Sequence, residues 1–395
     1  MSVKVKKSVE SLPAYKPAKS IISVSREYGI EEKDLIKLAG NENRLGCSKK
    51  VIEAINDNRL FFSYYPDMNV TRLREKLSEK LSVNGENLIF GNGSFELLTL
   101  VGETYIERGD EAIYTDPSFG WYQNVTLKNE GRIVKIPVTE KKSVDTEGIL
   151  KAINERTKVI WLCNPNNPTG TVLEPEVLED FISRVPENVL IVLDEAYIDF
   201  IDGDYIDTTK FIREYKNVII LRTFSKLYGL ASFRVGYGIA DESIINNILK
   251  VKLPINLSFT SQVAALAALE DEEFTEFVIK TNREQLEYYY REFEKLNLEY
   301  IPSNGNFILV NIGIDSAYAE TEFLKRGILI RNGSEFGLNR WLRISVGKSD
   351  ENVKVVETLK NILEVGEYDN KDTETVYKRE GHDKAGRTVY KGVFA

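Results

Sequence analysis

Short apolar runs rich in Val and Ile alternate with longer amphipathic segments over the first two thirds of the chain. In the amphipathic segments, apolar residues recur every three or four positions, as they do on one face of a helix. The runs that we predict as buried strands are Asn87–Phe90, Ala112–Tyr114, Arg132–Ile136, Lys158–Cys163, Val189–Leu193 and Val218–Leu221; the predicted helices between them include Ser94–Ile106, Asp145–Asn154 and Glu174–Val185. This alternation predicts an α/β fold with a mainly parallel sheet covered by helices on both faces. Functional residues of such sheets gather at the carboxyl ends of the strands.

The pattern changes after Pro254, where longer helices and short strands replace the regular alternation. Helices are predicted at Thr260–Glu270, Glu272–Leu296 and Asn352–Val365, and strands at Phe307–Val310, Ile328–Arg331 and Leu342–Val346. We therefore expect four parts: an N-terminal segment, 1–44, that packs with the smaller domain or a dimer partner; a large domain, 45–258; a smaller α+β domain, 259–366; and a polar tail, 367–395, expected to be loosely ordered.

Composition narrows the function classes. The 395 residues are enough for two domains, and the net charge of −9 argues against nucleic acid or an anionic membrane as partner. The sequence contains only two cysteines, Cys47 and Cys163, and one histidine, His382, which excludes a disulfide framework, a histidine triad and a multi-histidine metal site. No signal peptide and no apolar run of about 18 residues is present, so a cytoplasmic, metal-independent protein is expected. A catalyst that moves protons in this chain must use Lys, Tyr or a carboxylate.

Three polar stretches follow three consecutive predicted strands. They are Asn164–Gly170, with the sequence NPNNPTG; Asp194–Tyr197, with the sequence DEAY; and Thr223–Lys226, with Arg234 eight residues beyond the lysine. Upstream, Gly91–Ser94 joins a strand to a helix, and an aromatic group including Phe119 follows Pro117. Because all three strands are expected to end at one edge of the sheet, these side chains should meet there.

Together these residue types match the needs of a pyridoxal 5′-phosphate site. A lysine must bind the cofactor covalently and move a proton, and a carboxylate must keep the pyridine nitrogen protonated. A helix N-terminus with a serine and an arginine suits the phosphate, and an aromatic ring suits the pyridine face. We assign Lys226 to attachment, Asp194 to the ring nitrogen, Asn167 and Tyr197 to the phenolic oxygen, Gly93, Ser94, Phe95, Ser225 and Arg234 to the phosphate, and Phe119 to ring stacking.

Each stretch also has a purely structural explanation. The Gly91–Ser94 turn is typical of strand-to-helix connections, Asp194 could cap the next turn, and Lys226 alone could be a surface lysine. Pro and Asn are the residues of rigid turns, and the aromatic residues near Phe119 could belong to the core. These independent explanations would have to coincide at the ends of consecutive strands, in an order that fills every role. The combination therefore favours a cofactor site.

The motifs NPNNPTG, DEAY and Arg222–Lys226, followed by Arg234–Tyr237, resemble those of fold-type-I pyridoxal phosphate aminotransferases, and within them the histidinol-phosphate aminotransferase family. The resemblance covers roughly residues 15–365. Further matching motifs lie at Gly40–Asn43, Tyr65–Asp67, Asn306–Phe307, Gly327–Arg331 and Leu342–Gly347. It implies the aspartate-aminotransferase-like fold, with a mainly parallel seven-stranded sheet and a smaller α+β domain.

The resemblance also implies roles outside the cofactor motifs. Tyr65 would reach the cofactor phosphate of a neighbouring subunit, which implies a homodimer with shared active sites. Arg343 would bind the substrate carboxylate and Arg331 a distal phosphate. Tyr15 would close over the site, and Asn43 would join the substrate-binding residues. Arg343 on a half-buried strand could instead be structural.

Three positions depart from the family pattern. Arg44 stands where the family has proline and is expected to add positive charge near the substrate. Phe95 replaces an acidic residue, although its backbone amide could still serve the phosphate. Ile255 replaces a tyrosine that would line the pocket. These changes preserve the cofactor site and leave the exact substrate open.

We therefore expect a pyridoxal-phosphate-dependent aminotransferase that acts on a small phosphorylated amine or amino acid, with glutamate and 2-oxoglutarate as the second pair implied by the resemblance. An alternative on the same scaffold is a decarboxylase of phosphothreonine or phosphoserine, because the sequence does not reveal which substrate bond stands perpendicular to the ring. A non-catalytic binding protein is disfavoured because Lys226 is retained. A nucleotide-binding enzyme is disfavoured because Gly91–Ser94 lacks the P-loop lysine and spacing.

Overall fold

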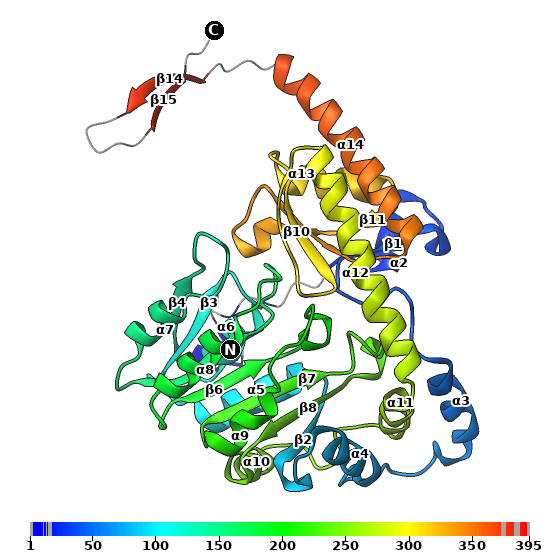
Figure 1. Ribbon diagram of the computed structural model, residues 1–395, viewed down its shortest axis with the longest axis vertical. Coiled ribbons are helices and arrows are strands. Elements are labelled where there is room, and N and C mark those ends of the chain that lie inside the picture. Colours follow the sequence, from blue (N-terminus) through cyan, green and yellow to red (C-terminus); the bar gives the residue numbers. More distant parts are fainter. Residues whose placement is uncertain are drawn as a thin grey trace.

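The computed structural model describes residues 3–10, 12, 14, 18–372, 377–382 and 388–392. The chain forms a larger part built on a wide sheet and a smaller part stacked on one end of it (Figure 1). The long helix α12 (Glu272–Lys295) runs along both parts. Two connecting segments contact both parts: Asn41 O accepts from Asn306 Nδ2 while Asn41 Nδ2 donates to Tyr197, and Asn304 N donates to Gly170 O.

Seven strands in the described part of the chain form the larger sheet, in the order β2-β8-β7-β6-β5-β3-β4. Their bounds are β2 Leu88–Asn92, β3 Glu111–Asp116, β4 Arg132–Pro137, β5 Thr157–Cys163, β6 Leu190–Asp194, β7 Val218–Thr223 and β8 Val235–Ala240. Strand β8 runs antiparallel to β2 and β7, and the other neighbours pair in parallel. The predicted mainly parallel α/β sheet is confirmed.

Both faces of this sheet are covered, which explains the continuous apolar runs in its strands. In β5, Ile160 and Leu162 pack into one core cluster, while Val159 and Trp161 pack into the cluster on the opposite face. The covering helices are α3 (Lys49–Asp57), α4 (Thr71–Leu81), α5 (Ser94–Tyr105), α6 (Trp121–Lys128), α7 (Thr146–Ala152), α8 (Pro175–Arg184), α9 (Phe211–Glu214), α10 (Glu242–Leu249) and α11 (Phe259–Leu269).

The smaller part contains a four-stranded sheet in the order β12-β13-β10-β9, packed against α12, α13 and α14. The bounds are β9 Glu299–Ile301, β10 Phe307–Asn311, β12 Arg331–Asn332, β13 Trp341–Ser345, α13 Ser316–Lys325 and α14 Ser349–Asp372. The N-terminal segment joins this part: α2 (Ile21–Tyr28) packs near α13, and β1 (Ile36–Lys37) pairs in parallel with β11 (Ile328–Leu329).

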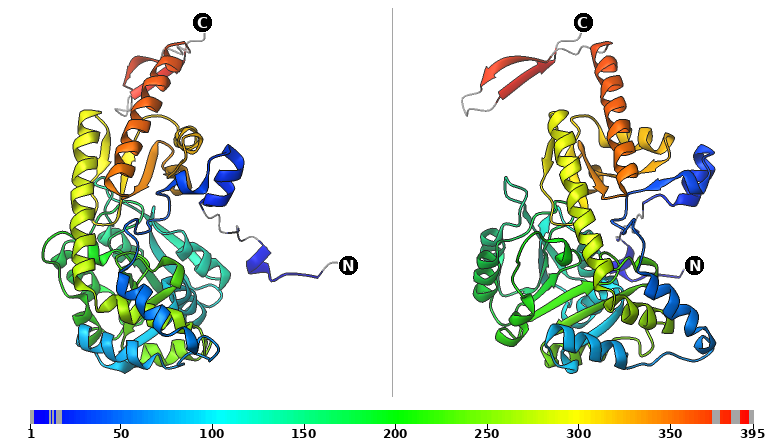
Figure 2. Two further views of the ribbon diagram at one scale, coloured as in Figure 1. Left: turned by 90° about the vertical axis from the view of Figure 1, so that its right-hand side faces the viewer. Right: turned by 45° about the vertical axis from the view of Figure 1, so that its right-hand side comes forward.

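Three differences between the structure and the sequence-based elements concern the sheets and the C-terminal region. Strand β8 was not predicted, because its sequence, VGYGIA, has two glycines that weaken a strand signal. The single strand predicted at Ile328–Arg331 is divided between β11 and β12, which join different sheets. Helix α14 continues to Asp372, and strands β14 (Tyr377–His382) and β15 (Thr388–Gly392) form a hairpin that projects from the body, where a loosely ordered tail was expected (Figure 2).

The short helix α1 (Lys7–Glu10) lies beside the larger part, far from that hairpin (Figure 2). Among the described residues, no helix combines the length and apolar character that a membrane crossing requires.

Candidate functional site

The three polar stretches that follow consecutive strands come together at one edge of the larger sheet. Cys163, the last residue of β5, pairs with Asp194 of β6, and Asp194 pairs with Leu221 of β7. This register places the loops after β5, β6 and β7 beside one another, as parallel strands require. Lys226 lies three residues beyond the end of β7.

A cavity of about 240 Å³ opens at this edge and collects most of the predicted cofactor residues. Its lining includes Ser94, Phe95, Phe119, Asn167, Asp194, Tyr197, Ser225, Lys226 and Arg234. Lys226 and Asp194, which the sequence assigned to opposite ends of one ring, therefore face the same small space.

Lys226 is held by the N-terminal segment that crosses between the two parts. Its Nζ donates to the carbonyl oxygens of Gly40 at 3.1 Å and Asn41 at 3.0 Å. Burial disfavours the ammonium form, and nearby Arg343 repels it, so the pKa of Lys226 falls from its ordinary 10.5 to about 8. A neutral, nucleophilic amine is therefore accessible near physiological pH.

Asp194 is buried, with 3% of its surface exposed, at the end of β6. Tyr122 donates its hydroxyl to Oδ2 at 2.7 Å, and the Ala196 amide donates to Oδ1 at 3.2 Å. Burial raises the pKa of Asp194 from 3.8 to about 6, while the Tyr122 hydrogen bond opposes that rise. The carboxylate is ionised at neutral pH and can accept a hydrogen bond from a protonated ring nitrogen.

Tyr197 and Asn167 belong to a buried network that also contains Arg343. The Tyr197 hydroxyl accepts from Asn41 Nδ2 at 3.0 Å and from Asn167 Nδ2 at 3.3 Å. Asn167 Oδ1 accepts from Arg343 Nη1 at 2.6 Å, and Ala39 O accepts from Arg343 Nη2 at 2.8 Å. The network links loops of the larger sheet to β13 of the smaller one, so both parts build the site.

The start of α5 forms a tightly packed cradle. Gly93, the N-cap, has φ of +75°, and a β-carbon there would collide with the Arg234 guanidinium. A β-carbon on Gly236 of β8 would meet Ser94 N at 2.5 Å. Only glycine lets the helix N-terminus, Arg234 and β8 approach this closely, and a helix N-terminus beside a guanidinium is a favourable place for an anion.

A second cavity, of about 840 Å³, adjoins the first along Phe119, Asn167, Tyr197 and Lys226. Arg331 and Arg343 line it, and they face each other directly across the β12–β13 pair. Glu335, four residues after Arg331, forms an ion pair with that guanidinium. Two buried arginines on paired strands repel each other unless an anion lies between or beside them.

The structure places four other predicted residues away from these cavities or outside its description. Asn43 donates to Leu227 O at 2.8 Å and lines a separate small cavity together with Arg44. Arg44 pairs with Glu351, so the expected added positive charge near the substrate is wrong: that charge is neutralised at another place. Tyr65 is 88% exposed on the surface. Tyr15 lies outside the described residues.

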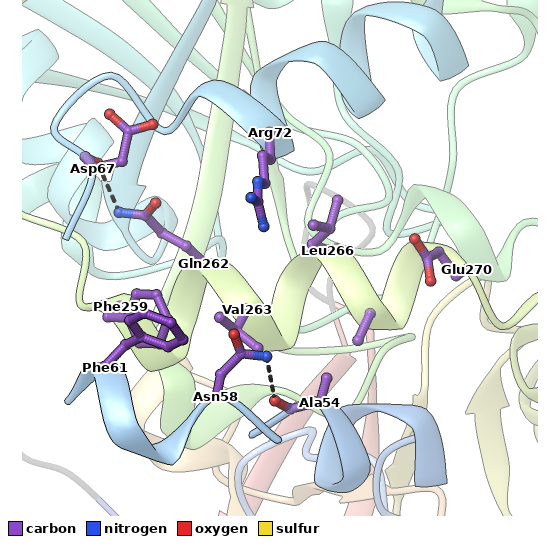
Figure 3. A pocket seen from close by; sticks show the side chains of 11 residues that line it. Ala54, Asn58, Phe61, Asp67, Arg72, Phe259, Gln262, Val263, Leu266 and Glu270 are labelled. Atoms are coloured by element: carbon purple, nitrogen blue, oxygen red, sulfur yellow. Dashed lines mark hydrogen bonds between the residues drawn. The ribbon is translucent and has the colours of Figure 1, made fainter. Parts of the chain in front are cut away.

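Tyr65 belongs to a surface that carries large exposed apolar side chains. The set comprises Leu60, Phe61, Phe62, Tyr64, Tyr65 and Met68. A groove of about 460 Å³ lies within it, between η2 (Arg59–Phe61), α4 and α11 (Figure 3). In Figure 3, the tilted ring pair of Phe61 and Phe259 lies at one end of the groove, Arg72 reaches in from α4, and Glu270 lies at the far end of α11. Apolar patches of this kind mark interaction sites.

Three contributors to the site were missed by the sequence analysis. Tyr122 was noticed only as an aromatic residue near Phe119, and nothing in the sequence distinguishes a hydroxyl that donates to a carboxylate from one that packs. The Gly40 and Asn41 carbonyls carry no side-chain signal. Glu335 could have been found, because it follows Arg331 at the i,i+4 spacing of ion pairs.

Comparison with known proteins gives a consistent result. The family model for aminotransferase class I and II matches residues 33–359. A histidinol-phosphate aminotransferase of Carboxydothermus hydrogenoformans is 43% identical over 363 residues, which cover 91% of this chain and 99% of the relative.

Among solved structures, histidinol-phosphate aminotransferase from Sinorhizobium meliloti in complex with pyridoxal 5′-phosphate is similar with a TM-score of 0.85 and 27% identity, covering 92% of this chain and 99% of that one. L-threonine-O-3-phosphate decarboxylase from Porphyromonas gingivalis is 23% identical with a TM-score of 0.75, covering 84% of this chain and all of that one; this likeness concerns the fold alone.

Proposed function

The chain belongs to the class I and II aminotransferases and is a pyridoxal-phosphate-dependent enzyme, and on that premise we propose that its amino donor is a small phosphorylated amine such as histidinol phosphate. The observation that carries the substrate proposal is the pair of buried arginines, Arg331 and Arg343, on adjacent strands beside Lys226. The second pair in the proposal is glutamate and 2-oxoglutarate.

The residues present fit the cofactor. The cradle at Gly93, Ser94 and Arg234 matches a phosphate dianion, and a β-carbon on Gly93 would displace the Arg234 guanidinium from it. Asp194, buried and ionised at neutral pH, suits the ring nitrogen. Phe119, edge-on to Tyr122 at 5.5 Å between ring centroids, lines the same cavity and is proposed to stack on the ring.

When bound, the cofactor supplies an electron-accepting ring that stabilises the negative charge left on the substrate carbon after deprotonation. In the proposed mechanism Lys226 removes that proton with a neutral amine, which its lowered pKa makes available. Asp194 keeps a proton on the ring nitrogen. Tyr197 and Asn167, which are hydrogen-bonded to each other, would hold the phenolic oxygen of the bound ring.

Arg331 and Arg343 are proposed to divide the recognition of anions. Arg343, tied to Asn167 close to the ring, is placed for the carboxylate of glutamate, and Arg331, paired with Glu335, for the distal phosphate. A phosphate dianion offers enough charge to displace the Glu335 carboxylate and to screen the repulsion between the two guanidinium groups. Burial raises the pKa of Glu335, although the ion pair with Arg331 opposes that rise, so its charged form is less favoured than that of a free glutamate.

The experiment is a substrate screen with variants. Purified enzyme is incubated with phosphorylated amines and phosphorylated amino acids, with and without 2-oxoglutarate. Glutamate formation that depends on the keto acid supports the proposal, and carbon dioxide release without an acceptor would establish the decarboxylase instead. Lys226→Ala should abolish turnover and the visible absorbance of the bound cofactor, whereas Lys210→Ala, which removes an exposed ion pair with Glu179, should change neither.

The arginine assignments are tested separately. Arg331→Met should lower kcat/KM for the phosphorylated donor about 100-fold and leave glutamate much less affected, because a buried charged contact contributes about 3 kcal/mol. Arg343→Met should produce the larger loss with glutamate. Equal losses on both substrates in both variants would contradict the division of roles.

A homodimer with shared active sites is part of the proposal. The exposed apolar surface around Phe61, Phe62 and Tyr65 supports it, because a monomer rarely leaves such a surface in water. Tyr65 is proposed to reach the partner's phosphate cradle. A cytoplasmic location is also proposed, since Cys47 and Cys163 are free thiols, which suit a reducing compartment.

A further inference from the structure

Tyr122 is fully buried beside the cofactor cavity and has no role in the mechanism described so far. We propose that Tyr122 is a positioning residue for the reaction: its hydroxyl fixes the orientation of the Asp194 carboxylate and keeps it ionised opposite the pyridine nitrogen. This inference rests on the proposed role of Asp194, and the experiments below separate the two.

The Tyr122 ring is held rigidly. It stacks on Trp161 of β5, with 5.6 Å between centroids and planes only 5° apart, and it meets Phe119 edge-on at 83°. Trp161 Nε1 donates to Thr126 Oγ1 at 3.2 Å, and that hydroxyl donates to Tyr122 O at 2.8 Å. The core packing of β5 and α6 therefore fixes the position of the Tyr122 hydroxyl.

The two donors to Asp194 restrain different oxygens. Tyr122 donates to Oδ2 at 2.7 Å and the Ala196 amide to Oδ1 at 3.2 Å, so the plane of the carboxylate cannot rotate freely. A carboxylate has about four acceptor positions, and two remain for a ring N–H. Of the two donors, the phenol is the shorter contact and the one that a side-chain substitution can remove.

The charge on Asp194 also depends on this contact. Burial raises its pKa, and the titratable groups facing it are Tyr122 from α6, Cys163 from β5, Glu195 next to it, Tyr197 beyond, and Lys226 after β7. Glu195 is paired with Arg222, the Cys163 thiol donates to Pro165 O, and Lys226 donates to the Gly40 and Asn41 carbonyls. Among these groups, Tyr122 is the one whose hydrogen bond to Asp194 favours the carboxylate.

The test is Tyr122→Phe, which removes one oxygen and keeps the ring that packs on Trp161. The matched control is Tyr289→Phe: Tyr289 is equally buried, and its hydroxyl donates to Asn352 Oδ1 at 2.8 Å in the smaller part. The cofactor dissociation constant is measured for each protein between pH 5 and pH 9. In the wild type, affinity should weaken as the pH falls through about 6, where Asp194 takes up a proton.

In Tyr122→Phe the same weakening should begin about one pH unit higher, because a hydrogen bond to a charged group contributes about 1.5 kcal/mol and one pKa unit corresponds to 1.36 kcal/mol. At pH 7 its kcat should fall about tenfold with little change in KM, since the contact acts on the ring and not on substrate binding. Tyr289→Phe should follow the wild type. The proposal would be overturned if the cofactor affinity of Tyr122→Phe followed the wild-type pH dependence or were lower by the same factor at every pH. A loss of packing alone would lower the affinity equally at every pH.

A double-mutant cycle with Asp194→Ala shows whether Tyr122 acts through Asp194. If it does, adding Tyr122→Phe to Asp194→Ala should cost no further activity; multiplied losses would overturn the inference. If Asp194→Ala itself retains near-normal activity and pH dependence, the assignment of Asp194 to the ring nitrogen fails. If Asp194→Ala strongly lowers activity while Tyr122→Phe changes neither activity nor the pH dependence of cofactor affinity, the assignment of Asp194 stands and the inference on Tyr122 is wrong.

Discussion

Desolvation is the main cause of the pKa shifts of Lys226 and Asp194, the two ionisable residues assigned to the ring. The two pKa shifts have opposite consequences for the proposed roles of these residues. Burial makes Lys226 easier to deprotonate and Asp194 harder to deprotonate. For Lys226 the shift favours the nucleophilic form, whereas for Asp194 it works against the charged form and hydrogen bonds must compensate. The sequence could predict which residues these are, but not their proton affinities, because burial and neighbouring charge follow from the fold.

The lowered pKa of Lys226 predicts how the cofactor-free enzyme captures pyridoxal phosphate. The capture rate should rise with pH and level off above about 8, because the neutral amine reacts and the ammonium does not. Stopped-flow absorbance between pH 6 and pH 10.5 measures this. Arg343→Met should move the midpoint upward, since Arg343 repels the ammonium. A rate that keeps rising beyond pH 10 would show that the lysine has its ordinary proton affinity.

At the scale of single elements, the strands with uninterrupted apolar runs were predictable and β8 was not. Continuous Val and Ile in β5, β6 and β7 satisfy both faces of the sheet at once, so the sequence carries a strong signal. Strand β8 instead has glycines at 236 and 238, where neighbouring backbone or side chains leave no room for a β-carbon. The glycines that weaken the strand signal of β8 include Gly236, which lets β8 pack closely against the start of α5 in the phosphate cradle.

Gly236→Ala should therefore damage the cradle. Its β-carbon would meet Ser94 N at 2.5 Å and Gly93 C at 2.7 Å, which are backbone atoms that cannot turn aside. We expect a loss of cofactor affinity of roughly 10- to 100-fold, corresponding to 1.4–2.8 kcal/mol, measured by equilibrium titration.

Gly238→Ala is the matched control, because its β-carbon meets the side-chain ends of Ile89 and Leu221 in the core. It should lower the thermal unfolding midpoint and leave cofactor affinity near the wild-type value. Similar cofactor loss in both variants would mean that general distortion of β8, and not the contact with Ser94, is responsible.

At the scale of the whole molecule, the proposed dimer predicts complementation between two inactive proteins. Lys226→Ala lacks the attachment point, and Tyr65→Ala lacks the residue proposed to reach the partner's cradle. Refolding the two together should give mixed dimers with one intact site, and activity should reappear at up to about a quarter of the wild-type value for random pairing.

Each variant refolded alone is the control, and size-exclusion chromatography with light scattering measures the mass. Complementation that fails although mixed dimers form would contradict the shared site. The sequence indicated this assembly only through family resemblance, because Tyr65 is an exposed tyrosine without local chemistry of its own.

The segment from Ala39 to Asn41 has a practical consequence for mutagenesis. Its carbonyl oxygens accept hydrogen bonds from Lys226 and Arg343, and every amino acid provides the same carbonyl. An alanine scan of these positions cannot remove those carbonyl contacts; at Asn41 it would remove only side-chain contacts, such as the hydrogen bond to the Tyr197 hydroxyl. Replacing an amide by an ester at the following residue weakens a carbonyl acceptor without altering any side chain. Such backbone substitutions can therefore measure how much the carbonyl hydrogen bonds of this segment contribute to activity.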